Sequence, residues 1–200
     1  DALRYTLCAT APESKDTDFT WGEFQARNNN ELVAIFGNFI NRVVVLTHKY
    51  WAGRVPSQNT LDNYDKDILK KLSDFPDKIG CSIEKFRFRE GLVELMNLAR
   101  LGNKYLADTE PWKLKAIDEK RTETILNIAI QIAASLAILS GPFMPFSSKK
   151  LKKILALRNV CWGDAGGLVI EKNHQINKPI HLFEKIEDEK IKAQLEKLHL

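Results

Sequence analysis

Asn38 and Arg42 are two polar residues in the stretch GNFINR, which lies inside the otherwise apolar run ELVAIFGNFINRVVVLTHKYW. If this run is helical, their spacing of four positions places the two side chains next to each other on one face. An amide beside a guanidinium offers several hydrogen-bond donors and an acceptor. The pair is therefore a candidate hydrogen-bonding site for a partner outside the chain.

The same pair has a plainer, structural interpretation. The aliphatic part of Arg42 can lie along the apolar surface while its guanidinium pairs with a carboxylate, and Asn38 can bond to a neighbouring loop. Polar residues at the border of a buried helix face most often do nothing more. Taken alone, Asn38 and Arg42 favour this structural role.

Trp112 is the second candidate, because it follows Pro111 in the stretch EPWKLK, directly after an expected helix end. An indole at such a junction can stand partly exposed and stack on a nucleobase, an interaction worth about 1–3 kcal/mol per base. A tryptophan can equally cover the end of a helical bundle. Both interpretations stay open on this stretch alone.

A third feature is the lysine-rich stretch SSKKLKK. A solvated helix face explains it well, and contact with phosphates is the less favoured interpretation. Its basic residues are Lys149, Lys150, Lys152 and Lys153.

These features fit one another better than each fits its structural explanation. A helix edge with Asn and Arg beside an exposed aromatic ring is how proteins recognise unpaired RNA bases. Cytosine has acceptors at N3 and O2 and a donor at N4, so Arg42 can donate to the acceptors while the Asn38 amide both donates and accepts. Uracil has a donor at N3 and an acceptor at O4, and it would meet this pair with the wrong polarity.

A helix over residues 24–51 must position Asn38 and Arg42. The stretch TWGE predicts its start, with Thr20 as the cap and Glu23 bonding back to it. Asn38 and Arg42 then lie near the solvent boundary, at the edge of a buried stripe. The stripe consists of apolar residues that recur every three or four positions: Leu32, Phe36, Phe39, Val43, Leu46 and Tyr50.

Other segments also predict helices. Residues 61–86 predict a weaker helix interrupted by Pro76 and Gly80, and residues 85–110 predict a helix that Pro111 ends. The run ILNIAIQIAASLAIL is apolar on nearly every face. A membrane span needs about 20 apolar residues, so this interrupted run predicts the central helix of a bundle instead. SSKKLKKILAL predicts another helix with a serine cap.

The last part of the chain changes character. Residues 163–184 can be extended, and EDEKIKAQLEKLHL predicts a short charged helix. The expected fold class is therefore all-α, a bundle of about four to five helices with an irregular C-terminal extension.

The composition, the spacing of cysteines and histidines and the absence of common motifs favour a globular chain without a metal or catalytic centre. Of 200 residues, 44% are hydrophobic and 28% charged, and the formal net charge of +4 permits an anionic partner without requiring one. Cys8, Cys81 and Cys161 are far apart and the four histidines have no ligand spacing, which argues against disulfides or structural zinc and favours a reducing cytoplasm. The common nucleotide-binding, hydrolase and metalloprotease motifs are absent. We expect no catalytic residue and no metal ligand.

The sequence begins DALRY, without an initiator methionine, and its first residues lack the pattern of a signal peptide. We therefore expect it to be a piece of a longer protein.

Four stretches carry a resemblance to a known family: DALRY, APESKDTDFTWGEFQARNNNELVAIFGNFINRV, NKYLADTEPW and LFEKIED. Together they resemble the C-terminal part of the bacterial-type methionyl-tRNA synthetases, which are class I enzymes. The resemblance implies that residues 1–18 end the catalytic domain and contact the stem, and that residues 19–160 form the α-helical anticodon-binding domain. It also implies that residues 161–200 are an extension that packs back along the bundle and ends in a short helix.

The resemblance gives roles to matching residues. In the family, an Asn and an Arg one helical turn apart contact the first base of the CAU anticodon, and a Trp after a Pro provides stacking. The matching positions are Asn38, Arg42, Pro111 and Trp112. The HIGH and KMSKS signatures, the methionine pocket and the zinc-bearing insertion would all lie upstream of Asp1, so no catalytic residue is carried over and the fragment alone is expected to be inactive.

The implied parent is a cytoplasmic ligase that joins methionine to tRNA(Met) through methionyl-adenylate, using ATP and magnesium, and the resemblance admits zinc as well. Its implied partners are the anticodon stem-loop of tRNA(Met) and its own catalytic domain, with no membrane, and a module beyond Leu200 that would make a homodimer. The alternative from another class is a non-catalytic helical module that docks a protein or a domain, with Asn38 and Arg42 merely structural.

Overall fold

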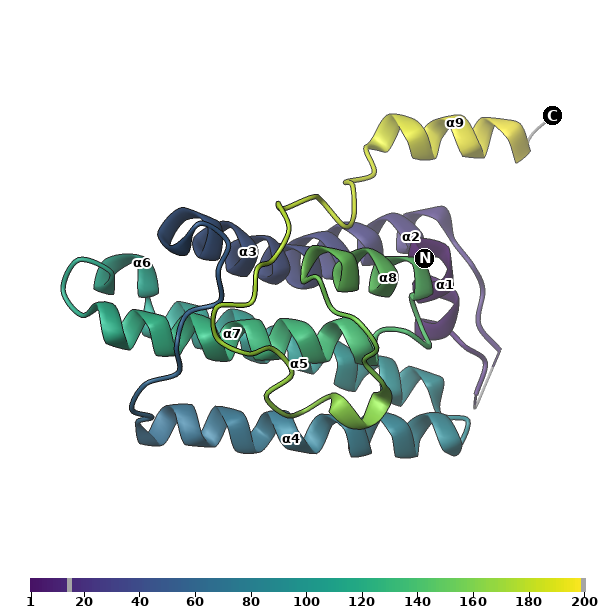
Figure 1. Ribbon diagram of the computed structural model, residues 1–200. Coiled ribbons are helices and arrows are strands. Elements are labelled where there is room, and N and C mark those ends of the chain that lie inside the picture. Colours follow the sequence, from purple (N-terminus) through teal and green to yellow (C-terminus); the bar gives the residue numbers. More distant parts are fainter. Residues whose placement is uncertain (14–15, 199–200) are drawn as a thin grey trace.

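Helices surround a central helix, α7, in the part of the chain that the computed structural model describes, residues 1–13 and 16–198. Over these residues there is no β-strand, and the only β-type pairing is an isolated bridge between Arg54 and Gln175. This confirms the expected all-α bundle with an irregular C-terminal extension (Figure 1). The elements are α1 (Ala2–Ala9), α2 (Trp21–Arg27), η1 (Asn28–Gly37), α3 (Asn38–Trp51), α4 (Asn63–Glu84), α5 (Phe88–Thr109), α6 (Pro111–Leu114), α7 (Glu119–Leu139), α8 (Pro145–Ile154), η2 (Trp162–Asp164) and α9 (Asp188–Leu198).

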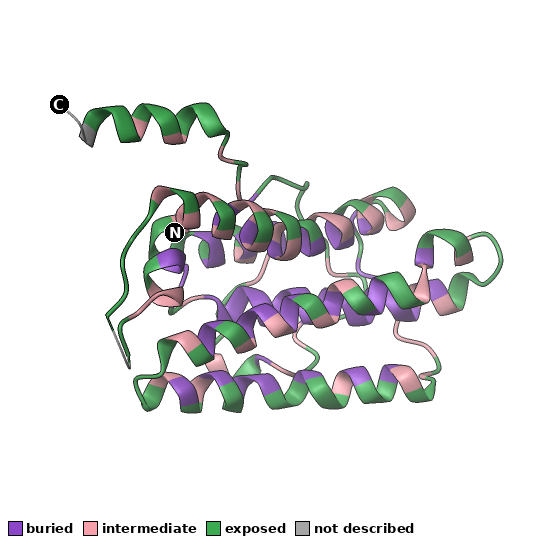
Figure 2. Ribbon diagram, turned by 180° about the vertical axis from the view of Figure 1, so that it is seen from behind, coloured by how far each residue is buried: buried purple, intermediate pink, exposed green. Residues whose placement is uncertain are grey.

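The central position of α7 follows from its composition. Every side chain from Thr124 to Leu139 is buried, because α3, α4, α5, α6 and α8 all pack against it (Figure 2). Among the described residues α7 alone has the length and composition to span a membrane, and 94% of its apolar window is buried inside the structure.

Three polar residues of α7 hold the irregular parts of the chain. Asn127, Gln131 and Ser135 recur every four positions and therefore share one face. Asn127 donates to the Pro56 carbonyl at 2.8 Å, and Ser135 accepts from the Gly166 amide at 3.0 Å. Gln131 uses both ends of its amide on the backbone at 169–170. Buried polar groups are thus satisfied by segments that lack regular hydrogen bonds of their own.

The helix predicted over 24–51 runs continuously from Trp21 to Trp51, but its middle part, η1, is wound as a π-helix. Thr20 caps the start as predicted, accepting from the Glu23 amide at 3.1 Å. The second half of the predicted capping box is wrong. The Glu23 carboxylate pairs with Arg27 at 2.8 Å instead of bonding back to the cap.

Two further expectations about helix ends are corrected. Residues 63–84 form one uninterrupted helix with Pro76 inside it, because a regular stripe of buried residues on α4 packs on the core on both sides of the proline. The helix α8 has no serine cap: it begins at Pro145, which needs no N–H at that position. Ser148 lies inside its first turn and donates to the Ala137 carbonyl at 2.6 Å.

The first helix and the segment that precedes the last helix pack on the bundle. In α1, Tyr5 is buried and its hydroxyl donates to Glu31 of η1. The C-terminal segment crosses the bundle, with Phe183 edge-on to Phe36 and Leu182 buried (Figure 1). The helix α9 stands away from the body, and Gln25 of α2 holds its first residue, Asp188, at 2.7 Å. The division into 1–18, 19–160 and 161–200 stays a prediction.

Candidate nucleic-acid interface

Arg42 and Trp112, which are far apart in the sequence, meet in the structure. The Arg42 guanidinium carbon lies 5.0 Å from the centre of the Trp112 ring, a cation–π contact between α3 and α6. Trp112 remains 38% exposed, so its indole is not used up in covering the end of the bundle. Asn38, one helical turn before Arg42, is exposed as well. Three of the predicted site residues therefore lie on the surface, two of them in contact.

Pro111 precedes Trp112 and anchors the start of α6 in the bundle. It is buried at the first position of α6, where its fixed φ suits a helix start. The preceding Glu110 has a left-handed backbone (φ 42°) that turns the chain sharply out of α5, and its carboxylate pairs with Lys113 at 2.8 Å. The turn and the proline together set the position of Trp112.

Asn103 on α5 is a site residue that the sequence analysis missed. Its Oδ1 accepts from Asn38 Nδ2 at 3.4 Å, and its Nδ2 donates to the carbonyls of Ile35 at 2.9 Å and Ala99 at 3.2 Å. The partner helix is 65 positions away in sequence, so no local pattern marks Asn103. The only sequence signal is the adjacent Gly102, whose missing side chain lets the Phe39 ring approach.

A second cation–π pair continues the aromatic surface next to α6. Lys115 Nζ lies 4.6 Å from the centre of the Trp51 ring, and it also pairs with Glu119. Trp51 is the last residue of α3. Its half-buried ring adds an aromatic edge and a cation close to the helix that carries Trp112.

Beneath the surface, a buried polar cluster joins the ends of α4, α5 and α7. The Asp65 carboxylate is completely buried and accepts from the Tyr105 hydroxyl at 2.7 Å and from the Arg121 guanidinium. Arg121 also pairs with Asp62 at 2.9 Å, and Asp62 and Asp65 cap α4 reciprocally. Thr109 donates to the Tyr105 carbonyl at 2.6 Å, which ties this cluster to the turn before Pro111.

The cluster should make stability depend on acid pH. Burial alone would raise the pKa of Asp65, but hydrogen bonds from Arg121, Tyr105 and the Asp62 amide outweigh it and hold the pKa below its ordinary value. A carboxyl that titrates lower in the folded state than its unfolded value of about 3.9 stabilises the fold above that pH. We expect this contribution to disappear as the pH falls below about 4, through the folded pKa.

Urea unfolding of the wild type and of Asp65→Asn from pH 7 to pH 3 measures this effect. The free energy of unfolding should fall more steeply below pH 4 for the wild type than for Asp65→Asn, because the two proteins differ only in the Asp65 carboxyl. Parallel curves would contradict the assignment.

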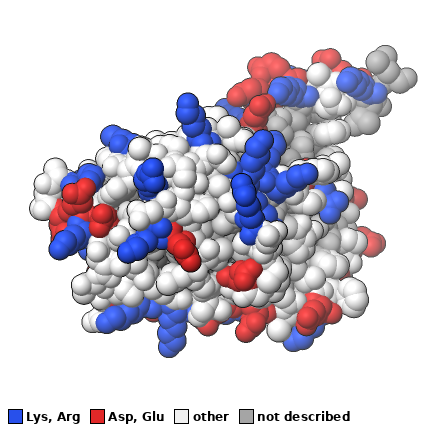
Figure 3. Space-filling model, in the orientation of Figure 1, with Lys and Arg blue, Asp and Glu red and all other residues white. Residues whose placement is uncertain are grey.

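The lysine cluster lies elsewhere. Lys149, Lys150 and Lys153 are exposed and Lys152 is half-buried, all on α8. Figure 3 shows basic side chains gathered over this region, whereas α6 with Trp112 lies at the opposite end of the bundle from the N-terminus (Figure 1). The structure does not bring the lysines to Trp112.

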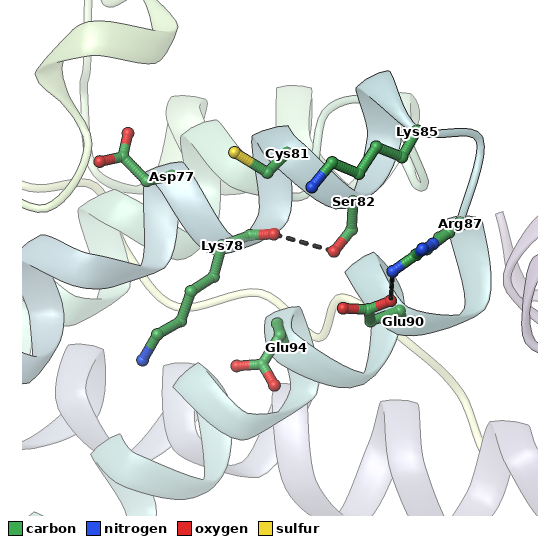
Figure 4. Close-up of a pocket in the computed structure, with 8 residues that line it drawn as sticks. All are labelled: Asp77, Lys78, Cys81, Ser82, Lys85, Arg87, Glu90 and Glu94. Carbon is green, nitrogen blue, oxygen red and sulfur yellow. Dashed lines mark hydrogen bonds and ion pairs between the residues drawn. The ribbon is translucent and has the colours of Figure 1, made fainter.

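Another hollow on the surface offers no comparable chemistry. The groove between α4 and α5 is lined by Asp77, Lys78, Cys81, Ser82, Lys85, Arg87, Glu90 and Glu94, so it carries both signs of charge (Figure 4). The Ser82 hydroxyl donates to the Lys78 carbonyl at 2.9 Å, and Arg87 pairs with Glu90. Within the described residues, no group of three or more His, Cys, Asp or Glu could hold a metal ion.

Comparison with known proteins places this geometry in a family. The family described as the anticodon binding domain of methionyl tRNA ligase matches residues 55–199, and the class I tRNA synthetase family (M) matches residues 1–44. Methionine–tRNA ligases of Phocaeicola vulgatus and Bacteroides fragilis are 56% and 54% identical over 199 residues. These alignments cover 99% of this chain but 29% of each relative, so the chain spans less than a third of their length.

Solved structures show the same fold. The free form of Mycobacterium tuberculosis methionyl-tRNA synthetase superposes with a TM-score of 0.88 at 21% identity, covering 93% of this chain and 39% of that one. The form in complex with methionyl-adenylate gives 0.84, with 91% and 37% covered. Because the first family match spans more than half of the sequence, this chain belongs to the family of methionyl-tRNA ligase anticodon-binding domains.

Proposed function

We propose that this chain recognises the CAU anticodon of tRNA(Met), through Asn38, Arg42 and Trp112 with Pro111 as their support. The observation that carries the proposal is the contact of the Arg42 guanidinium with the exposed Trp112 ring, one helical turn from Asn38. An unpaired base can stack on indole surface that Arg42 leaves uncovered. Its edge then faces a guanidinium and an amide.

The proposed chemistry follows from donors and acceptors. Arg42 carries only donors, so it matches the N3 and O2 acceptors of cytosine. Family membership supports a parent that attaches methionine to tRNA using ATP, and we assign ATP and magnesium to a catalytic domain outside this chain. The recognition step needs neither.

A domain-docking role is the second candidate, and one observation favours it. Leu3 and Leu7 of α1 are 49% and 51% exposed on the same helix that buries Tyr5. We propose that this apolar face of α1 contacts the catalytic domain of the parent, which accounts for exposed leucines without replacing the RNA-binding role.

Binding of labelled anticodon hairpins tests the proposed function. The chain should bind a CAU hairpin more tightly than a UAU hairpin by about 1–3 kcal/mol, the usual worth of one well-made base contact. Binding to both should weaken between low and moderate salt, because phosphate contacts release counterions. Equal or absent binding by a folded sample would favour the docking role alone.

A further inference from the structure

We infer that Asn103 is a positioning residue that determines which base the site accepts, by holding the Asn38 amide in one orientation. The inference rests on the proposed function and deepens it. It assigns a specificity role to a side chain that would not touch the base.

The orientation of Asn103 is fixed by its partners. Its Nδ2 lies 2.9 Å from the Ile35 carbonyl oxygen and 3.2 Å from that of Ala99, and carbonyl oxygens only accept. The end of the amide that faces these carbonyls must therefore be the nitrogen. Its other end, Oδ1, is an acceptor, and it faces Asn38.

The fixed Asn103 amide in turn orients Asn38. Because Asn103 presents an acceptor, Asn38 turns its Nδ2 toward α5, at 3.4 Å, and keeps its own Oδ1 for a partner. Flipping the Asn38 amide would set two oxygens against each other. Asn38 is exposed, so this oxygen is available to a ligand at the surface.

An outward oxygen selects an amino group. Cytosine offers its 4-amino donor to Asn38 Oδ1 while Arg42 donates to its acceptors. Uracil presents O4 at the same place and would meet an acceptor with an acceptor. Asn38 can adapt to uracil only by flipping, which Asn103 opposes.

The packing around Asn103 makes this arrangement rigid. A Cβ on Gly102 would lie 2.4 Å from the Phe39 ring, so α5 approaches the helix that carries Asn38 as closely as a glycine permits. The Ile35 carbonyl lies just before the change from π to α winding at Asn38. Such π-wound turns are frequent at functional sites. Asn103 bonds to the segment at this point.

Three variants separate specificity from stability. Asn103→Ala removes both the acceptor for Asn38 and the donors to Ile35 and Ala99. Asn103→Asp keeps the acceptor and loses the donors. Asn97→Ala is the matched control, since Asn97 lies on the same helix and its side chain bonds, within the described part of the chain, only to Glu94 and Arg100.

The readout is the ratio of the affinities for CAU and UAU hairpins, measured with the full 200-residue chain. For Asn103→Ala we expect the ratio to fall roughly fivefold to tenfold, with UAU binding improving, because one hydrogen bond no longer fixes Asn38. Asn103→Asp and Asn97→Ala should keep the wild-type ratio, although Asn103→Asp should melt at a lower temperature. An unchanged ratio in folded Asn103→Ala, or an equal loss in Asn103→Asp, would overturn the inference.

A change in the RNA provides a test that leaves the protein intact. A hairpin with 2-pyrimidinone as its first anticodon base keeps N3 and O2 but lacks the 4-amino group. The wild type should bind it roughly fivefold to tenfold more weakly than the CAU hairpin. Equal binding would show that Asn38 accepts nothing from that amino group and would overturn the inference, while a preserved preference for CAU over UAU would leave the proposed function standing. No preference at all would overturn both.

Discussion

Replacing Arg121 by methionine is expected to lower the free energy of unfolding by about 3–5 kcal/mol, the usual cost of removing one partner from a buried ion pair. Asp65 is completely buried, and among the described residues Arg121 supplies the only positive charge that it contacts. Without the guanidinium, the carboxylate keeps the Tyr105 hydroxyl and the Asp62 amide, which do not neutralise it. Urea unfolding at pH 7 measures the change.

Two comparison variants make this result specific. Arg100→Met removes an exposed arginine whose guanidinium bonds to Asn97 alone over the residues that the structure describes, and it should change the free energy of unfolding by less than about 0.5 kcal/mol. Asp65→Leu combined with Arg121→Met removes the stranded charge and should recover part of the loss. If Arg121→Met is as mild as Arg100→Met, the cluster does not hold the helix ends together.

The sequence predicted which residues of the site helix are buried and which lie at its edge, but it did not predict how the helix is wound. Helical periodicity placed Phe36 and Phe39 in the core and Asn38 and Arg42 at its edge, and the structure has all four there. Periodicity succeeds here because burial of one helix face is a local, repeated constraint. It does not report the π winding of η1, which uses the same residues with a different hydrogen-bond spacing.

Contacts between helices explain what was missed. Asn103 acts on Asn38 only because Gly102 allows two distant helices to come close, and a single sequence does not show that pairing. Pro76 was expected to interrupt a helix, since a proline removes a hydrogen bond. The apolar stripe of α4 packs on the core on both sides of it and overrides that local preference.

Removing the Trp112 ring should weaken binding to the CAU hairpin more than any other single truncation at the surface. Trp112→Ala should cost about 1–3 kcal/mol, or about 5- to 150-fold in affinity, because the stacking surface disappears. The same change should also lower the CAU preference, since Arg42 loses the ring that it lies against at 5.0 Å. Trp112→Phe keeps a smaller ring and should lose less of both.

The matched control for Trp112 is Trp162→Ala, a half-buried tryptophan in η2 that packs near Gly80. Its removal should lower the melting temperature and leave hairpin affinity unchanged in the folded protein. Trp112 is 38% exposed on the short helix α6, so its removal should affect melting less. Trp112→Ala should therefore lower hairpin affinity with little change in melting temperature, whereas Trp162→Ala should lower the melting temperature with no change in affinity. Unchanged affinity in folded Trp112→Ala would remove the indole from the site, and Arg42 would then have to bind the base without a stacking partner.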